Sequence, residues 1–179
     1  MYRIMLVDDE PNILNALNRL FKREKDFEIE IFESAKEAIK RAQVTVFDLF
    51  LSDYRMPEMN GVKFLSEIRA LQSESMRLIL SGHTDLDALL GAINQAQIYR
   101  FVTKPWNDYD LISTVRSALE YRNILVENRR LADTVRDQAE ELNKRKTALE
   151  KFQKAHPTLV AINWAEDGSI VLDDQLIRK

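Results

Sequence analysis

The sequence predicts an α/β protein built on a parallel five-stranded sheet. Over the first two-thirds of the chain, short apolar runs rich in β-branched and aromatic residues alternate with longer segments of helical period, which is typical of such sheets. At 179 residues the chain is long enough for one good core, and its hydrophobic content of 45% is too high for intrinsic disorder. We therefore expect one α/β domain followed by an appendage.

Five strand–helix pairs follow one another along this part of the chain. The expected strands lie near residues 2–7, 27–32, 47–52, 76–80 and 99–103, and the expected helices near 12–24, 35–43, 61–72, 85–95 and from 107 onward. Ser34 and Glu37 form a capping-box pattern at the second helix, and Asn107 or Asp108 can cap the fifth. Because these residues fall where the helical period begins, they support the alternation.

Composition excludes several classes of protein. The net charge of −3 gives no whole-chain attraction to nucleic acid or anionic lipid. The chain has no cysteine, which excludes disulfides, thiolate zinc sites and cysteine nucleophiles and fits a reducing compartment. The apolar run at residues 4–7 is far too short for a signal peptide or a membrane span. We therefore expect a cytoplasmic protein with no membrane span.

Polar side chains follow four of the expected strands. Asp8 and Asp9 come directly after the first strand, Asp53 ends the third, Ser81 follows the fourth and Lys104 follows the fifth. In open α/β sheets the ligand crevice lies beyond the carboxyl ends of the strands, so these side chains are expected to meet there. Any one of them alone could be an ordinary turn or surface residue, but the set as a whole indicates a site.

The chemistry of this set suits phosphoryl transfer to a carboxylate. Three carboxylates with no histidine or cysteine nearby favour Mg²⁺, which takes oxygen ligands. Lys104 can pair with a carboxylate at rest and with a phosphoryl oxygen afterwards, and Ser81 offers a hydroxyl at the same edge. Asp53 needs no further base, because aspartate is ionised near neutral pH.

Four segments of the sequence resemble response regulator receiver domains of two-component signal transduction. They are Asp8-Asp9-Glu10, the stretch from Leu51 through Asp53 and Met56-Pro57 to Gly61, Leu80-Ser81-Gly82-His83, and Phe101-Val102-Thr103-Lys104-Pro105-Trp106. The resemblance covers residues 1–122 as a receiver domain. It implies a flavodoxin-like (βα)5 fold of strand order 2-1-3-4-5, with a histidine kinase or a phosphotransfer protein as phosphoryl donor.

The resemblance also implies a role for each residue of the metal and acceptor site. Asp53 resembles the aspartate that becomes phosphorylated, so the chain would be a phosphoprotein. Asp9 resembles a direct Mg²⁺ ligand, and Asp8 an acid that acts mainly through metal-bound water. The backbone carbonyl of Arg55 resembles a further ligand of the metal.

A second group of residues resembles the conformational switch of the family. Ser81 and Phe101 correspond to the switch pair, in which the hydroxyl turns toward the phosphoryl group and the ring turns inward. Lys104 would contact a phosphoryl oxygen. Plain core packing is the alternative for Phe101, since an aromatic residue in a strand usually packs for its own sake.

The segment at residues 107–155 is expected to form one long helix that continues into a coiled coil, because no proline or glycine interrupts it. A heptad register places Tyr121, Asn128, Val135, Leu142 and Leu149 at position a, and Ile124, Leu131, Gln138, Arg145 and Phe152 at position d. These a and d positions form a largely apolar stripe, which favours a parallel homodimer through residues 121–155. The polar residues at d weaken the second half of the stripe. A lone amphipathic helix or a folded-back hairpin is the alternative.

The last segment, residues 156–179, is expected to form a small hairpin. Asp167-Gly168 lies between two β-prone runs, which is a strong hairpin signal. An isolated two-stranded hairpin is marginal in water, so this one is expected to pack on something.

We therefore expect a response regulator that is not an enzyme and signals through dimer geometry or through a downstream effector protein. A DNA-binding output is disfavoured, because the chain after Pro157 carries only Arg178 and Lys179 as basic residues. A cyclic-dinucleotide phosphodiesterase needs clustered histidines, and only His83 and His156 exist, so the alternative is a fragment or a partner of such an enzyme. A magnesium-dependent phosphohydrolase is less favoured, because no second acid lies near Asp53 as proton donor.

Overall fold

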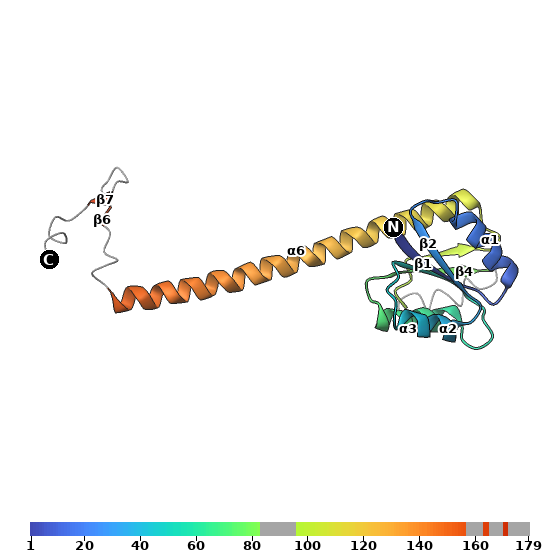
Figure 1. Ribbon diagram of the computed structural model, residues 1–179, viewed down its shortest axis with the longest axis horizontal. Coiled ribbons are helices and arrows are strands. Elements are labelled where there is room, and N and C mark those ends of the chain that lie inside the picture. Colours follow the sequence, from blue (N-terminus) through green and yellow to red (C-terminus); the bar gives the residue numbers. More distant parts are fainter. Residues whose placement is uncertain (83–95, 157–162, 165–169, 172–179) are drawn as a thin grey trace. The chain divides into compact units, whose positions relative to one another are not determined.

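The computed structural model describes residues 1–82, 96–156, 163–164 and 170–171 (Figure 1). Its contacts divide the chain into two units, Met1–Asn128 and Arg129–Lys179. The first unit holds the sheet and its helices. Helix α6 (Asp108–Ala155) contributes residues to both units.

The first unit is built on a five-stranded parallel sheet of order β2-β1-β3-β4-β5, which confirms the predicted fold class. The strands are β1 (Tyr2–Val7), β2 (Phe27–Phe32), β3 (Leu49–Asp53), β4 (Met76–Ser81) and β5 (Arg100–Thr103). All five strands of this sheet lie close to the ranges that the apolar runs predict. The pairing of Asp53 with Leu80 and of Ser81 with Thr103 aligns the carboxyl ends of β3, β4 and β5.

Helices cover both faces of the sheet. The helices of this unit are α1 (Pro11–Phe21), α2 (Ala35–Ala42), α3 (Gly61–Leu71) and the first turns of α6. Figure 1 shows α2 and α3 together on one face, with α1 and the start of α6 on the other. The helix expected at residues 85–95 lies outside the described residues. None of the described helices is both long enough and apolar enough to cross a membrane.

Two apolar clusters hold the layers together. Along β1, Ile4 and Leu6 pack into the cluster beneath α1 and α6, whereas Met5 and Val7 pack into the cluster beneath α2 and α3. Successive residues of a strand point to opposite faces, so a strand covered on both faces must be apolar throughout. This is why the strands read as continuous apolar runs rather than as alternating ones.

The capping predictions have mixed outcomes. Asn107 caps α6, because its side-chain oxygen accepts hydrogen bonds from the N–H groups of Tyr109 (2.9 Å) and Asp110 (3.2 Å). The capping box at α2 is wrong: Ser34 occupies the N-cap position, but its side chain makes no capping hydrogen bond. The start of α2 depends instead on the backbone bond from Ala38 to the Ser34 carbonyl and on the acidic Glu37 in the first turn.

Helix α6 contacts the amino-terminal end of the sheet within the first unit, which runs to Asn128. Arg122 forms an ion pair of 3.0 Å with Asp48, at the start of the strand β3. Asn123 donates a hydrogen bond of 2.7 Å to the hydroxyl of Tyr2 on β1. These contacts attach α6 to the amino-terminal end of the sheet, opposite the end where the predicted site residues lie.

The second unit contains the rest of α6 and two short strands. β6 (Asn163–Trp164) pairs antiparallel with β7 (Ile170–Val171), as the predicted hairpin requires. The Asp167-Gly168 turn itself lies outside the described residues.

Gly61, the first residue of α3, packs directly against the backbone of β3. A Cβ atom at this position would lie 2.1 Å from the carbonyl oxygen of Asp53. Real side chains do not approach backbone oxygens so closely, so this position requires glycine for reasons of space.

We predict that Gly61→Ala lowers the free energy of unfolding by about 1–3 kcal/mol, the usual scale of overpacking a core. The direction of this change is informative, because alanine in place of glycine within a helix normally raises the free energy of unfolding by about 1 kcal/mol. Urea denaturation measures the change, and Lys63→Ala, an exposed position in the same turn, is the control. A Gly61→Ala variant as stable as the wild type would contradict the close packing.

Candidate functional site

The predicted site residues come together at the carboxyl end of the sheet. Asp8 directly follows β1, Asp53 is the last residue of β3, Ser81 the last of β4, and Lys104 directly follows β5. Because the strands are parallel, residues far apart in sequence emerge side by side at this edge.

Lys104 joins the two buried carboxylates. Its ammonium nitrogen lies 2.7 Å from Asp8 Oδ2 and 2.6 Å from Asp53 Oδ1. Asp8 is fully buried, Asp53 is 6% exposed, and the Lys104 side chain is 20% exposed. Two carboxylates this close repel each other unless a cation lies between them, and in this structure the cation is the lysine.

Backbone N–H groups bind the remaining carboxylate oxygens. Glu10 donates its N–H to Asp8 Oδ1 at 2.9 Å, and Arg55 donates its N–H to Asp53 Oδ2 at 2.5 Å. Both carboxylates are therefore fixed at both oxygens. Arg55 thus contacts Asp53 through its backbone amide, whereas the sequence pointed only to its carbonyl; its side chain is exposed.

The pKa values of Asp8 and Lys104 are both raised, but for different reasons. Burial raises the pKa of Asp8 above its ordinary value of 3.8 and outweighs the hydrogen bonds from Lys104 and Glu10, which lower it. Burial lowers the pKa of Lys104, but its hydrogen bonds to Asp53 and Asp8 outweigh this and raise it above 10.5. Lys104 therefore remains charged at neutral pH and holds the two acids together.

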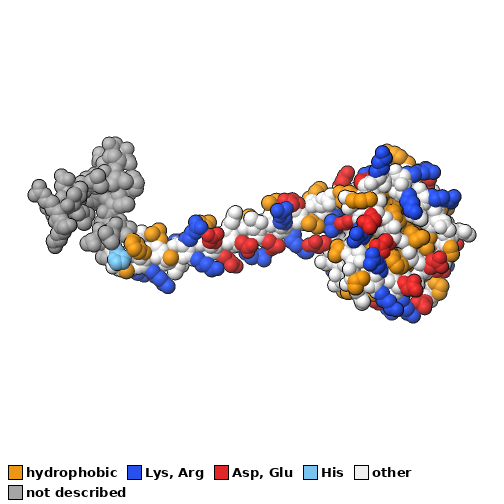
Figure 2. Space-filling model, viewed as in Figure 1, with side chains coloured by type: hydrophobic (Ala, Val, Ile, Leu, Met, Phe, Trp, Pro, Cys, Tyr) orange, Lys and Arg blue, Asp and Glu red, His pale blue; other side chains and the backbone are white. Residues whose placement is uncertain are grey.

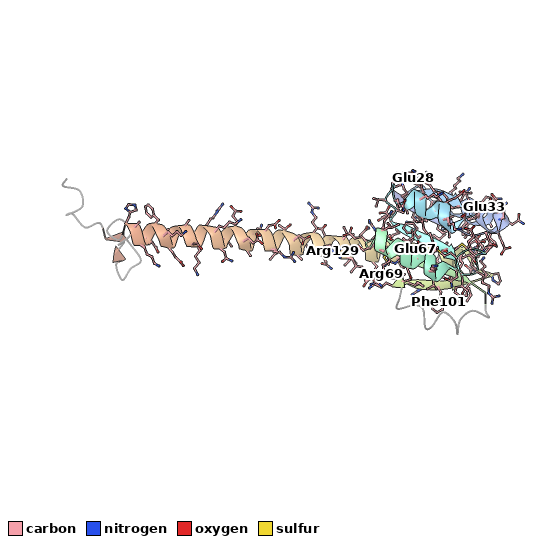
Figure 3. The ribbon with its side chains drawn as sticks, turned by 90° about the horizontal axis from the view of Figure 1, so that it is seen from below. Glu28, Glu33, Glu67, Arg69, Phe101 and Arg129 are labelled. Atoms are coloured by element: carbon pink, nitrogen blue, oxygen red, sulfur yellow. The ribbon has the colours of Figure 1, made fainter. Side chains whose placement is uncertain are left out.

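The expected switch residues flank this group. The hydroxyl of Ser81 is buried and has no hydrogen-bond partner within the part of the chain that the structure describes. The Ser81 carbonyl accepts a hydrogen bond of 2.7 Å from the N–H of Lys104. Phe101 lies on β5, is partly buried and packs against the cluster beneath α2 and α3 (Figure 3). His83 lies outside the described residues.

The donor set fits a hard divalent cation in its chemistry. Asp8, Asp9 and Asp53 offer carboxylate oxygens only, which Mg²⁺ prefers to nitrogen or sulfur. Within the described ranges, no three acidic or histidine side chains are arranged closely enough to hold a metal ion. In this arrangement Lys104 supplies the positive charge that faces Asp8 and Asp53, and Asp9, the next residue after Asp8, is half-buried.

Sequence reasoning missed the part that Glu10 plays. Besides donating its N–H to Asp8, it places Oε1 4.0 Å from the Lys104 ammonium. Its position directly after the two aspartates was the available signal. An acid at that place looks like a helix-capping residue, and Glu10 does occupy the N-cap position of α1, although its side chain makes no capping hydrogen bond.

Comparison with known proteins agrees with this geometry. Residues 4–116 match the family described as the response regulator receiver domain. The hydrogenase transcriptional regulatory protein HoxA of Bradyrhizobium diazoefficiens is 35% identical over 117 residues, covering 65% of this chain and 24% of that protein. The chain thus spans about a quarter of the length of that curated relative.

Two solved structures share the fold. An uncharacterized protein from Neptuniibacter caesariensis is 39% identical with a TM-score of 0.67, over 71% of this chain and 93% of that one. The signal receiver domain of an HD domain-containing protein from Pseudomonas fluorescens is 31% identical with a TM-score of 0.65, over 68% of this chain and 97% of that one.

We predict that Asp8→Asn stabilises the fold at neutral pH. Because the pKa of Asp8 is higher in the folded chain than in the unfolded one, its contribution to stability falls as the pH rises above 3.8. Removing the buried charge should raise the free energy of unfolding by about 1 kcal/mol near pH 7 and flatten its decline from acidic to neutral pH.

Urea denaturation across that pH range measures the effect. Asp137→Asn, an exposed carboxylate on α6, is the control and should leave the profile unchanged. Loss of stability in Asp8→Asn at neutral pH would mean that the ion pair with Lys104 outweighs the cost of burial.

Proposed function

The chain belongs to the response regulator receiver domain family and is a two-component response regulator, and from this premise we propose that Asp53 accepts the phosphoryl group. The donor would be a histidine kinase or a phosphotransfer protein. The observation that carries the proposal is the Lys104 ammonium held between Asp8 and Asp53. Receiver domains are in general signalling domains rather than enzymes, and we propose that this chain is not an enzyme.

The arrangement supplies what formation of an acylphosphate needs. Asp53 presents a carboxylate oxygen as nucleophile, and Lys104 can follow the negative charge from that oxygen to a phosphoryl oxygen. Arg55 keeps the second oxygen of Asp53 in place through its N–H. Glu10 does the same for Asp8, so both acids are oriented before any donor arrives.

Mg²⁺ is the proposed cofactor of this site. Asp8, Asp9, Asp53 and the backbone carbonyl of Arg55 would hold it, with Asp8 acting mainly through metal-bound water. When bound, the ion would neutralise negative charge on the phosphoryl oxygens. Asp8 and Asp53 would then have a second cation to face besides Lys104.

Ser81 and Phe101 are the proposed switch pair. Among the described residues the buried hydroxyl of Ser81 has no hydrogen-bond partner, which is costly, and a phosphoryl oxygen on Asp53 would offer it an acceptor. Phe101 is partly buried on the edge strand β5, so part of its ring remains exposed and could become buried on turning inward. The modification would in this way bias two conformations of the first unit.

We predict that acetyl phosphate adds one phosphoryl group to the protein in the presence of Mg²⁺ and that Asp53→Asn abolishes this addition. Intact mass spectrometry measures it, with EDTA in place of Mg²⁺ as a second control. Unchanged phosphorylation in Asp53→Asn would exclude Asp53 as the acceptor. Turnover of a generic phosphate ester by the wild type would favour a phosphohydrolase instead.

The output is proposed to pass through α6. Every described side chain from residue 129 to residue 156 is exposed in the single chain, including the apolar ones that recur along the helix (Figure 2). Leu131, Val135, Leu142, Leu149 and Phe152 are all at least half exposed. Burying each such side chain contributes roughly 1.5–3 kcal/mol, so a second copy that covers them has a clear driving force.

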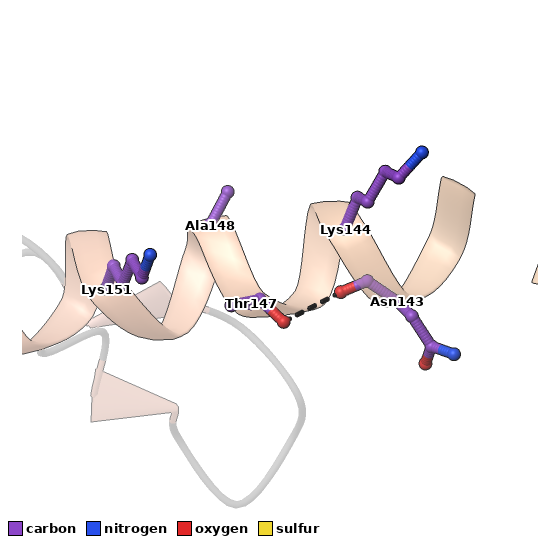
Figure 4. Close-up of a pocket in the computed structure, with 5 residues that line it drawn as sticks. All are labelled: Asn143, Lys144, Thr147, Ala148 and Lys151. Atoms are coloured by element: carbon purple, nitrogen blue, oxygen red, sulfur yellow. Dashed lines mark hydrogen bonds between the residues drawn. The ribbon is translucent and has the colours of Figure 1, made fainter. Parts of the chain in front are cut away.

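The proposed partner of this stripe is a parallel copy of the same helix, paired through residues 121–155. Within the single chain, Glu141 binds Arg145 of its own helix at 2.5 Å. This contact neutralises the charge of Arg145 at its d position. Away from the stripe, Asn143, Lys144, Thr147 and Lys151 form a polar face around a shallow hollow (Figure 4).

We predict that Leu142→Gln with Leu149→Gln lowers the dimer affinity by at least tenfold, because two buried apolar layers are lost. Lys144→Gln with Lys151→Gln has the same spacing on the polar face and should leave the affinity unchanged. Sedimentation equilibrium measures both. A wild-type monomer at tens of micromolar, or equal effects of the two variants, would contradict a dimer through the stripe.

Signalling would then follow from altered dimer geometry or from docking of a downstream effector protein, without DNA contact by this chain. The family assignment favours a two-component response regulator over a fragment or partner of a cyclic-dinucleotide phosphodiesterase.

A further inference from the structure

Ser52, the residue before the proposed acceptor, is a hydroxyl in an otherwise apolar layer. It is fully buried in β3, and its neighbours in the sheet are Val7 on β1 and Ile79 on β4. Both neighbours belong to the cluster beneath α2 and α3. A buried hydroxyl needs a hydrogen-bond partner to be tolerated at such a position, so the partner identifies its role.

That partner is the backbone of the acceptor itself. Ser52 Oγ donates a hydrogen bond of 2.9 Å to the carbonyl oxygen of Asp53. Gly61 packs on the same oxygen, because a Cβ added there would lie 2.1 Å from it and 3.1 Å from Ser52 Oγ. The carbonyl of Asp53 is thus held between the hydroxyl and the first residue of α3.

Two further backbone hydrogen bonds fix this peptide group and the next one. The N–H of Tyr54 donates to the Leu80 carbonyl at 2.9 Å, and the N–H of Gly61 donates to the Tyr54 carbonyl at 2.9 Å. With both carbonyls held, the direction of the following N–H, that of Arg55, is fixed as well, because it shares a planar peptide group with the Tyr54 carbonyl. It points at Asp53 Oδ2 and donates to it at 2.5 Å.

We infer that Ser52 is a positioning residue for the acceptor: its hydroxyl sets the peptide that follows Asp53, so that the Arg55 amide orients the Asp53 carboxylate. This rests on the proposed function of Asp53. The Arg55 carbonyl, proposed as a metal ligand, belongs to the same fixed stretch of backbone, so the Ser52 hydroxyl also bears on Mg²⁺ affinity.

The test compares Ser52→Ala with Ser66→Ala in the full-length protein. Ser66 on α3 is a matched control, since its hydroxyl also donates to a backbone carbonyl, that of Val62, at 2.9 Å. The amide proton of Arg55 is followed by NMR, because a short hydrogen bond to a carboxylate shifts it downfield. Ser52→Ala should move this resonance upfield, and Ser66→Ala should not.

Two further measurements complete the experiment. Mg²⁺ is titrated while the Arg55 amide resonance is followed, and the rate of phosphorylation by acetyl phosphate is measured. Ser52→Ala should weaken Mg²⁺ binding and slow phosphorylation by about tenfold, the usual scale for groups that orient a metal or reaction site. An unmoved Arg55 resonance, or equal changes in Ser66→Ala, would overturn the inference. A moved resonance in a protein whose wild type takes no phosphoryl group would uphold the positioning role and refute the proposed function.

Discussion

Two carboxylates cannot share a buried site without a positive charge between them, and Lys104 supplies that charge to Asp8 and Asp53. The rest of the site follows from this constraint. Burial raises the pKa of Asp8, whereas the two acids raise that of Lys104, so the group is stable only while the lysine is present and charged. A phosphoryl group on Asp53, as proposed, would compete for the same ammonium, so the ion pair would respond to that modification.

The sheet makes this arrangement possible by bringing distant residues together. Lys104 and Asp8 are separated by 96 positions in sequence, yet their side chains meet because parallel strands end at one edge. Apolar clusters pack on both faces of the sheet whose strands end there. At the opposite edge, Asp48 holds Arg122 of α6, so the helix proposed to carry the output is attached to the same sheet.

Helix α6 combines two physical roles in one continuous element. Its first turns bury Leu111, Val115 and Leu119 in the core, as any helix of such a domain must. From residue 129 onward all its described side chains are exposed, and the apolar period continues with no described part of the chain covering it. A helix that keeps its apolar stripe beyond its own core needs another partner, and this is the strongest argument for a second copy.

The sequence by itself determined the alternation of strands and helices, their parallel pairing and the meeting of Asp8, Asp53, Ser81 and Lys104, because apolar period and strand ends are local signals. Backbone contacts were beyond its reach. Three features depend on the direction in which a peptide group or a hydroxyl faces. They are the absence of a capping hydrogen bond from the Ser34 side chain, the hydrogen bond from the Arg55 amide to Asp53, and the Asp53 carbonyl held by Ser52 and Gly61. Those directions are set by packing between elements distant in sequence, so only the tertiary structure decided them.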